Sequence, residues 1–269
     1  MTAAGGSGRR ADIGVYGGSG LYSLLDEVEE VAVDTPYGAP AAPMTIGEVA
    51  GRRVAFLPRH GRDHSLPPHR VPYRANAWAL HELGVRAIFG PCASGSLRPD
   101  IHPGEFVVVD QIIDRTNGRD ASFHDGPGSP PGFAPVDHVS FAEPYDGRLR
   151  AAAVEACRSE GVTVHDGGTV VVIEGPRFST RAESLWYGAQ GWQVINMTQM
   201  PEAVLAAEIG VPYAAIALIT DYDVGLEGMP GIEPVTMDEV FATLERNAAV
   251  VRNVLFRAVE LLPDSLFAR

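Results

Sequence analysis

The sequence predicts an α/β fold in which a single domain holds a mixed, largely parallel central sheet flanked by helices. Short apolar runs alternate along the chain with longer segments of helical spacing, an order that is typical of this architecture. No linker-like break and no internal repeat divides the 269 residues, a length at the upper edge of one domain. We therefore assign residues 11–269 to one domain and the Gly/Ala-rich residues 1–10 to a disordered tail.

The elements are expected to follow one another in this alternating order. The 28–58 region has strand character, and Ala50-Gly51 is expected to close a hairpin within it. Further strands are expected at 12–16, 53–57, 85–89, 105–110, 168–173, 193–196 and 211–219, and helices at 73–83, 145–160, 201–209 and 236–262. Helix-end signals are Gly84 and the capping-box pairs Thr180–Glu183 and Thr236–Glu239.

The composition argues against several classes of partner. The chain carries 21 basic and 34 acidic residues, a net charge of −13, and no Lys/Arg-rich block, so nucleic-acid and membrane partners are not expected. No stretch approaches the roughly 18 apolar residues of a membrane span. The two cysteines, Cys92 and Cys157, form no Cys-x-x-Cys pair, which favours a reducing, cytoplasmic location over a disulfide framework or a thiolate zinc site.

Three loops are rich in Gly, Pro or other small residues. Residues 90–96 follow a predicted strand and would let a ligand approach the backbone closely. Residues 115–135 form a longer segment than a simple connecting loop needs, and this length is typical of a lid or an interface loop. In Gly17-Gly18-Ser19-Gly20, consecutive glycines allow backbone amides to face an anion, although a plain tight turn explains them equally well.

A cationic and imidazole cluster follows a predicted strand at residues 59–64. Arg59 offers a planar fork suited to phosphate, and His60 adds a further donor. The alternative interpretation is a solvated loop. A zinc site on His60 and His64 lacks an apparent third ligand, so no metal is predicted.

Two carboxylates, Asp221 and Asp223, follow the apolar run of residues 211–219. Ligands of open α/β sheets bind at the carboxyl ends of strands, and a shielded carboxyl there has a raised pKa and can exchange a proton. A turn residue is the alternative for either Asp alone. Because further polar clusters follow other predicted strands, the sequence favours a site.

These motifs resemble those of the methylthioadenosine phosphorylases in the trimeric purine nucleoside phosphorylase family. The resemblance covers nearly everything from residue 13 to the final helix. It is carried, in order, by Gly17-Gly18-Ser19-Gly20-Leu21, Arg59-His60-Gly61, Gly95-Ser96-Leu97-Arg98, Glu174-Gly175-Pro176-Arg177-Phe178, Asn196-Met197-Thr198 and Thr220-Asp221-Tyr222-Asp223. Six motifs in the right order are far more specific than any one of them.

The resemblance implies a phosphate site that is built from several loops. Its members would be Ser19, Arg59, His60, Cys92, the amide of Ala93 and Thr198. Relatives carry Thr where this chain has Cys92, and a thiol is a weaker hydrogen-bond donor, a lack for which Ser94 could compensate.

The resemblance also implies how a nucleoside would be held. Met197 would lie against the ribose, Phe178 and Ser179 near the base, and Asp221 and Asp223 would recognise the purine. Relatives that use 6-oxopurines carry Asn at the corresponding place, so the two carboxylates favour adenine. The apolar Met237 and Val240 suit a 5′-methylthio group, and His138 matches a residue that reaches across from a neighbouring subunit of a trimer.

The activity implied is phosphorolysis of methylthioadenosine, with inorganic phosphate as co-substrate and no other cofactor. Asp221, Arg59 and His60 are the expected catalytic residues. The alternatives are a purine nucleoside phosphorylase of broader or 6-oxopurine preference that acts on methylthioinosine, a nucleosidase that uses water, and a nucleoside-binding protein without turnover.

Overall fold

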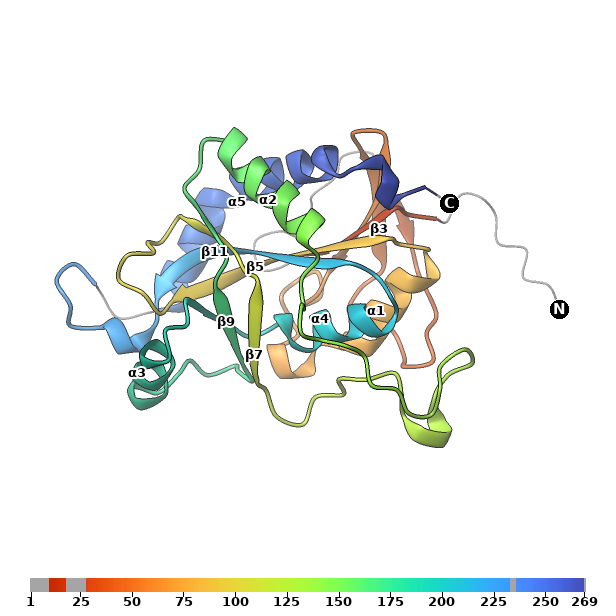
Figure 1. Ribbon diagram of the computed structural model, residues 1–269, viewed down its shortest axis with the longest axis horizontal. Helices are drawn as coiled ribbons and strands as arrows, with labels where there is room; N and C mark the ends of the chain where they lie inside the picture. Colours follow the sequence, from red (N-terminus) through yellow and green to blue (C-terminus); the bar gives the residue numbers. More distant parts are fainter. Residues whose placement is uncertain (1–9, 18–27, 233–235, 269) are drawn as a thin grey trace.

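The structure of the chain, a computed structural model, describes residues 10–17, 28–232 and 236–268. One mixed sheet forms its centre, with helices α2 (Gly147–Ser159) and α5 (Met237–Leu261) on one face and α1 (Tyr73–Glu82) and α4 (Gln199–Glu208) on the other (Figure 1). The predicted α/β fold is therefore confirmed. Ser19, with most of its glycine turn, and residues 1–9 of the predicted tail lie outside the described residues.

The sheet has the order β2-β3-β4-β1-β5-β10-β9-β7, while β11 pairs with β5 and β6, and β6 with β8. The strands are β1 Ile13–Gly17, β2 Glu29–Val31, β3 Met44–Val49, β4 Arg52–Pro58, β5 Ala87–Ser96, β6 Phe106–Val108, β7 Gln111–Arg115, β8 Val164–Asp166, β9 Thr169–Ile173, β10 Val194–Asn196 and β11 Tyr213–Tyr222. The remaining helices are α3 Arg181–Ala189 and the short 3-10 turns Pro68–Arg70, Gly126–Gly128, Val224–Leu226 and Asp264–Leu266.

Strand β1 shows how the sequence buries both faces of the sheet. Ile13 and Val15 belong to the core that includes α2 and α5, whereas Tyr16 belongs to the core that includes α1 and α4. A Cβ at Gly14 would come within 2.8 Å of Leu80 Cδ1, so the missing side chain lets α1 pack closely.

Local signals also form as predicted, with one difference. Ala50 and Gly51 turn the β3–β4 hairpin at positive φ. Thr180 and Glu183 form the capping box of α3. At α5 the Thr236 hydroxyl accepts from the Glu239 N–H, but the Glu239 carboxylate bonds that hydroxyl instead, so this end carries a simple N-cap.

The prediction of a loop at residues 90–96 was wrong, because β5 continues through Ser96. One edge of β5 pairs with β11 from Ile88 to Ser96. Glycine is rare inside strands, but here a Cβ at Gly90 would collide with the Tyr213 hydroxyl of the neighbouring strand. The small residues therefore serve close packing within the sheet.

Of the two carboxylates, Asp221 lies within strand β11, whereas Asp223 lies just beyond its end. β11 runs to Tyr222, and its register against β5 shifts between Ile219 and Asp221. This bulge at Thr220 gives β11 one extra residue, a device that re-aims side chains at sites. Asp221 is thus held by sheet pairing, while Asp223 begins the turn Val224–Leu226 with its N–H donating to the Ser96 carbonyl.

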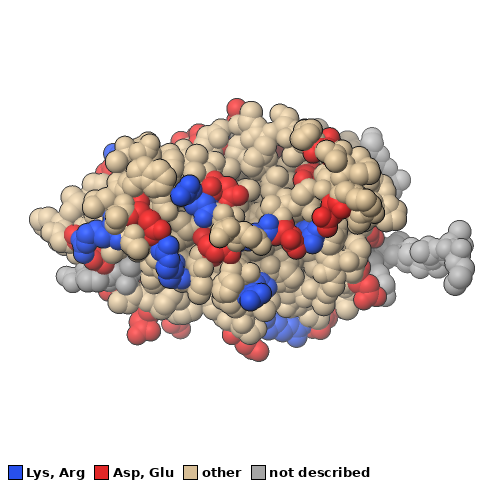
Figure 2. Space-filling model, turned by 90° about the horizontal axis from the view of Figure 1, so that it is seen from below, with Lys and Arg blue, Asp and Glu red and all other residues tan. Residues whose placement is uncertain are grey.

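The predicted long loop is present between β7 and α2. The segment of residues 116–146 holds only the short turn Gly126–Gly128 among its described elements, and it runs along the edge of the molecule below α1 and α4 in Figure 1. On the face shown in Figure 2, basic and acidic side chains are interspersed. No described helix has the length and apolar character that a membrane span requires.

Candidate active site

A cavity of about 430 Å³ opens where the sheet splits. One edge of β5 pairs with β11 throughout, whereas the other edge passes from β1, at residues 87–89, to β10, at residues 95–96. β1 runs parallel and β10 antiparallel to β5, so their carboxyl ends point towards each other across the gap. Cys92, Ala93 and Ser94 of β5, between these two pairings, line the cavity, at the kind of switch point where α/β proteins bind ligands.

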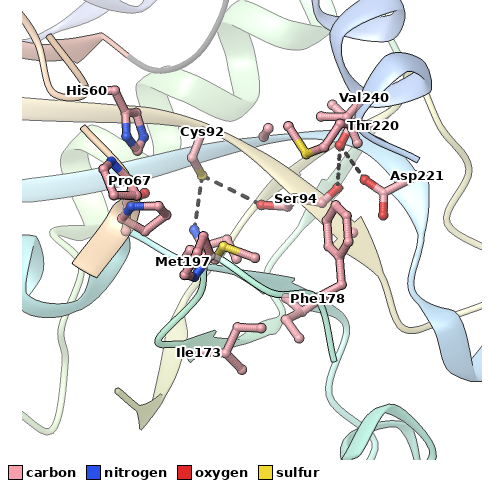
Figure 3. A pocket seen from close by; sticks show the side chains of 18 of the residues that line it. His60, Pro67, Cys92, Ser94, Ile173, Phe178, Met197, Thr220, Asp221 and Val240 are labelled. Atoms are coloured by element: carbon pink, nitrogen blue, oxygen red, sulfur yellow. Dashed lines mark hydrogen bonds between the residues drawn. The ribbon is translucent and has the colours of Figure 1, made fainter. Parts of the chain in front are cut away.

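The structure brings most of the predicted site residues to this cavity. Its lining includes Arg59, His60, Cys92, Ala93, Phe178, Met197, Thr198, Asp221, Asp223, Met237 and Val240. His60 lies at one end and Asp221 at the other, with Met197 between them (Figure 3).

Arg59 is already paired in the structure. Its side chain is 1% exposed, and Nε and Nη2 donate to the two oxygens of Glu202 at 2.6 and 3.0 Å, while Nη1 donates to the Pro91 carbonyl at 2.8 Å. Burial pushes the pKa of Arg59 down, but the Glu202 carboxylate more than offsets this and raises it. Arg59 therefore remains charged at the cavity wall, with two of its five N–H groups still free of these bonds.

His60 follows Arg59 and is 6% exposed. Its Nδ1 lies 2.8 Å from the Leu66 carbonyl oxygen. Burial, and then the charge of Arg59, lower the pKa of His60 to about 4, so the ring is neutral at pH 7. The prediction that His60 serves as a plain donor thus needs revision, since its one N–H is directed to Leu66.

Cys92 joins β5 to the segment after β10. Its Sγ accepts from Asn196 Nδ2 at 3.3 Å and from Gln199 Nε2 at 3.4 Å, and lies 3.7 Å from Ser94 Oγ. Its S–H has the Ile216 carbonyl within 3.9 Å. The sulfur is therefore engaged in the framework behind the cavity, beside the Ser94 hydroxyl that was expected to compensate for the thiol.

The two carboxyls lie at the opposite end. Asp221 Oδ1 accepts from Thr220 Oγ1 at 2.6 Å, and burial, opposed by this bond, raises the pKa of Asp221 to about 6. Asp223 is 2% exposed, burial raises its pKa, and its Oδ2 has no hydrogen-bond partner among the described residues. A Cβ at Gly95 would lie 3.0 Å from Asp221 Oδ2, so glycine leaves room for this carboxyl.

Two predicted residues do not line the cavity. Ser179 is buried next to Phe178, and its Oγ has no partner in the described part of the chain. His138 is exposed on the segment of residues 116–146, where its N–H donates to Asp137 Oδ1 at 2.8 Å. Its predicted role in a neighbouring subunit stays a prediction.

An apolar wall closes the cavity beside these groups. Met237 is 45% exposed and Val240 is buried, both at the start of α5. His64 also lines the cavity, with its ring centroid 4.7 Å from that of His60 and 5.7 Å from that of Phe241. Within residues 10–17, 28–232 and 236–268, no group of three His, Cys, Asp or Glu side chains is arranged to hold a metal.

The family model described as the phosphorylase superfamily matches residues 12–260. The chain belongs to this superfamily. It is 54% identical to a purine nucleoside phosphorylase of Streptomyces coelicolor, over 95% of this chain and 91% of the relative, and 52% identical to an S-methyl-5′-thioadenosine phosphorylase of Mycolicibacterium smegmatis, over 92% and 90%. Its structure is similar to that of methylthioadenosine phosphorylase from Schistosoma mansoni in complex with adenine, with a TM-score of 0.88, 38% identity and coverage of 94% and 92%.

Two residues of this superfamily member escaped the sequence analysis. Glu202, the partner of Arg59, is a buried charge in the apolar helix α4, and that misplaced charge was a signal that could have revealed it. Arg119, on the segment of residues 116–146, has a side chain only 3% exposed and left no such signal.

Arg119 ties together the loops that carry the cavity wall. Its Nη1 donates to the carbonyls of Met197, at 2.8 Å, and Met200, at 2.6 Å. Nε and Nη2 donate to the carboxylate and the carbonyl of Glu174, at 3.0 and 2.7 Å. The segment carrying Thr198 is thereby fixed to the β9 end.

Proposed function

We propose that this protein cleaves S-methyl-5′-thioadenosine with inorganic phosphate to give adenine and 5-methylthioribose 1-phosphate. The observation that carries the proposal is the pair of buried carboxyls, Asp221 and Asp223, at one end of a cavity whose other end holds Arg59 and His60. Relatives named S-methyl-5′-thioadenosine phosphorylase, at 52% and 49% identity, support this activity.

The carboxyls suit adenine because they can present one acceptor and one donor. The 6-amino group of adenine donates, and the unpartnered Oδ2 of Asp223 is an acceptor that would gain a bond it lacks in the described structure. N7 accepts, and Asp221, whose pKa is raised to about 6, holds a proton more readily than an ordinary carboxyl.

The reaction breaks the bond between C1′ and N9 and forms a bond between C1′ and a phosphate oxygen. Positive charge develops on the sugar and negative charge on the base. Protonation at N7 by Asp221 stabilises the departing adenine. Arg59, held by Glu202 in one orientation, fixes the phosphate for attack, and Thr198 and the Ala93 amide complete its binding.

The 5′ substituent would meet Met237 and Val240. Both side chains are apolar and line the cavity, so they favour a methylthio group over a hydroxyl that needs a hydrogen-bond partner. His64 lies in the same wall and would contact this group.

We further propose that the protein works as a cytoplasmic homotrimer that needs no metal or organic cofactor. His138 is exposed on a long irregular segment, which suits a residue that enters the site of a neighbouring subunit. The resemblance of the motifs supports the trimer, and the absence of a Cys-x-x-Cys pair supports the cytoplasm.

A second candidate is a purine nucleoside phosphorylase with broader or 6-oxopurine specificity. The 54% identity to the Streptomyces coelicolor protein of that name favours it. A 6-oxo group accepts where adenine donates, so it would not supply the donor that the unpartnered Oδ2 of Asp223 lacks.

A phosphate-dependent cleavage assay with methylthioadenosine, adenosine and methylthioinosine separates the candidates. We expect the highest kcat/KM for methylthioadenosine and no cleavage without phosphate. A preference for methylthioinosine would overturn the assignment of the base, and cleavage without phosphate would make the protein a nucleosidase. Binding of methylthioadenosine without cleavage would leave a nucleoside-binding protein.

A further inference from the structure

The protonation pattern of the His60 ring is defined by its contact with Leu66. A carbonyl oxygen only accepts hydrogen bonds, so the 2.8 Å contact requires the proton on Nδ1. In a neutral imidazole the second nitrogen, Nε2, then carries a bare lone pair. The ring is thus an acceptor on its other side.

That other side faces the cavity. His60 lines the cavity and lies at the end opposite Asp221 (Figure 3). In the described part of the chain, the Leu66 contact is the one hydrogen bond of the ring, and Nε2 is not among the buried atoms without a partner, so it reaches the cavity space.

The surroundings oppose a second proton on this ring. Arg59, His64 and Arg119 are the titratable side chains that act on it most strongly, and all three are basic. The Leu66 carbonyl acts in the opposite sense but is outweighed by burial and by Arg59. A ligand at Nε2 therefore meets an acceptor.

We infer that His60 accepts a hydrogen bond from the co-substrate and thereby selects an oxyanion that still carries a proton. Monohydrogen phosphate and monohydrogen arsenate each have one O–H to donate to Nε2, whereas sulfate at neutral pH has none. This inference rests on the proposed phosphorolysis and assigns to it the protonation state of the co-substrate.

The proton balance of the reaction shows where the proton of the co-substrate goes. Hydrogen phosphate enters with one proton, and the sugar phosphate leaves as a dianion without it. Adenine leaves neutral, with one proton more than it had as part of the nucleoside. When the C1′–O bond forms, the remaining P–OH becomes as acidic as that of a phosphate monoester, with a pKa of about 6. At neutral pH this proton goes to solvent, because His60, whose pKa is lowered to about 4, is too weak a base to hold it; Asp221 supplies the proton on adenine and regains one from solvent.

The ring itself can be observed without any turnover. In the protein labelled with ¹⁵N-histidine, at pH 7 and without ligand, we expect His60 to show a protonated Nδ1 and an unprotonated Nε2. A proton on Nε2, in either the other tautomer or the imidazolium, would overturn the inference.

Oxyanion binding by calorimetry tests the selection. Phosphate and arsenate are expected to bind with similar affinity at pH 7.5, and sulfate at least about tenfold more weakly, because it leaves the Nε2 lone pair opposite an anionic oxygen. Equal affinities of phosphate and sulfate at pH 7.5 would refute the selection.

Two variants distinguish the contribution of His60 to anion selection from that of the neighbouring His64. The amide of His60→Gln can turn either its donor or its acceptor to the anion, so the preference for phosphate over sulfate should shrink to within about threefold. His64→Gln, whose ring lies beside His60, should keep the full preference. Retention of the full preference in His60→Gln would show that another group selects the anion.

Failure of the inference can be told from failure of the proposed function. If nucleosides are cleaved but sulfate binds as well as phosphate, the role of His60 is wrong and the phosphorylase stands. If phosphate is preferred but no nucleoside is cleaved, the oxyanion site stands without the reaction.

Discussion

The two ends of the cavity treat their charged groups in opposite ways. At one end the Arg59 guanidinium is almost fully buried and donates two hydrogen bonds to Glu202, and His60 is bonded to Leu66. At the other end burial raises the pKa of both Asp221 and Asp223, and Asp223 Oδ2 has no partner in the described chain. At the first end the Arg59 charge is compensated before a ligand arrives, whereas at the second a buried carboxyl oxygen has no partner in the described chain.

This difference matches what each end must do. An anion site has to keep a fixed positive charge in place, and a buried ion pair with two parallel hydrogen bonds provides that geometry. A site that transfers a proton needs a group whose two protonation states are close in free energy near neutral pH, which unsatisfied burial of a carboxyl produces. The Arg59–Glu202 ion pair therefore stabilises the folded state at the first end, whereas the buried carboxyls lower its stability at the second.

Removing the partner of Arg59 should have the largest effect. Glu202→Ala leaves an uncompensated buried charge, and we expect the free energy of unfolding to fall by about 3–5 kcal/mol in urea denaturation. Glu260→Ala removes the exposed partner of Arg257 and should cost less than about 1 kcal/mol. Similar losses in the two variants would mean that the buried pair does not stabilise the phosphate end.

At the opposite end of the cavity, removing the Asp221 carboxyl should lower the catalytic activity. Asp221→Asn cannot transfer a proton to the base, so kcat/KM for methylthioadenosine should fall by about 10²–10³-fold. The matched control is Asp34→Asn, at an exposed residue that does not line the cavity, and it should leave kcat/KM unchanged. If the two variants lose activity equally, Asp221 does not protonate the base.

Much of this arrangement was visible in the sequence because it depends on local pattern. Alternating apolar runs predicted the fold, and the polar clusters after strands predicted most of the cavity lining. The extension of β5 was missed because its small residues serve packing against Tyr213, a contact made only in the folded sheet. The partner of Arg59 lies 143 residues away, and no spacing rule connects such residues.

The same Asp221 variant should gain stability as it loses activity. The folded-state pKa of about 6 lies above the value of an unfolded Asp, so the protonated form is stabilised by folding and this contribution is lost as the pH rises through 6. At pH 8 the buried ionised carboxyl should cost roughly 1–3 kcal/mol, which Asn avoids. Denaturation of both proteins at pH 5 and pH 8 measures this change.

We expect the stability of Asp221→Asn relative to the native chain to increase between these two pH values. Asp34→Asn should show no such increase, because its side chain is exposed. Parallel stability profiles for Asp221→Asn and the native chain would mean that the carboxyl is not held in an unfavourable state.

Arg119 allows a smaller test of the junction between the two ends. A lysine keeps the charge but cannot reproduce the fork that reaches Met197, Met200 and Glu174 at once. Arg119→Lys would release the segment that carries Thr198. We therefore expect KM for phosphate to rise about tenfold, the equivalent of one or two lost hydrogen bonds. The value of kcat should stay within about threefold of that of the native protein. Steady-state kinetics with phosphate as the varied substrate separates the two constants.

The matched control for Arg119 is Arg74→Lys. Arg74 bonds Asp120 and Asp125 of the same irregular segment, but both carboxylates are exposed and neither lies in the cavity lining. Its replacement loosens the segment without releasing the cavity wall, so KM should stay within about twofold, as expected for surface ion pairs. If both variants raise KM alike, order in the segment as a whole sets phosphate binding. A rise with Arg119→Lys alone assigns that role to the contacts of Arg119 with Met197, Met200 and Glu174.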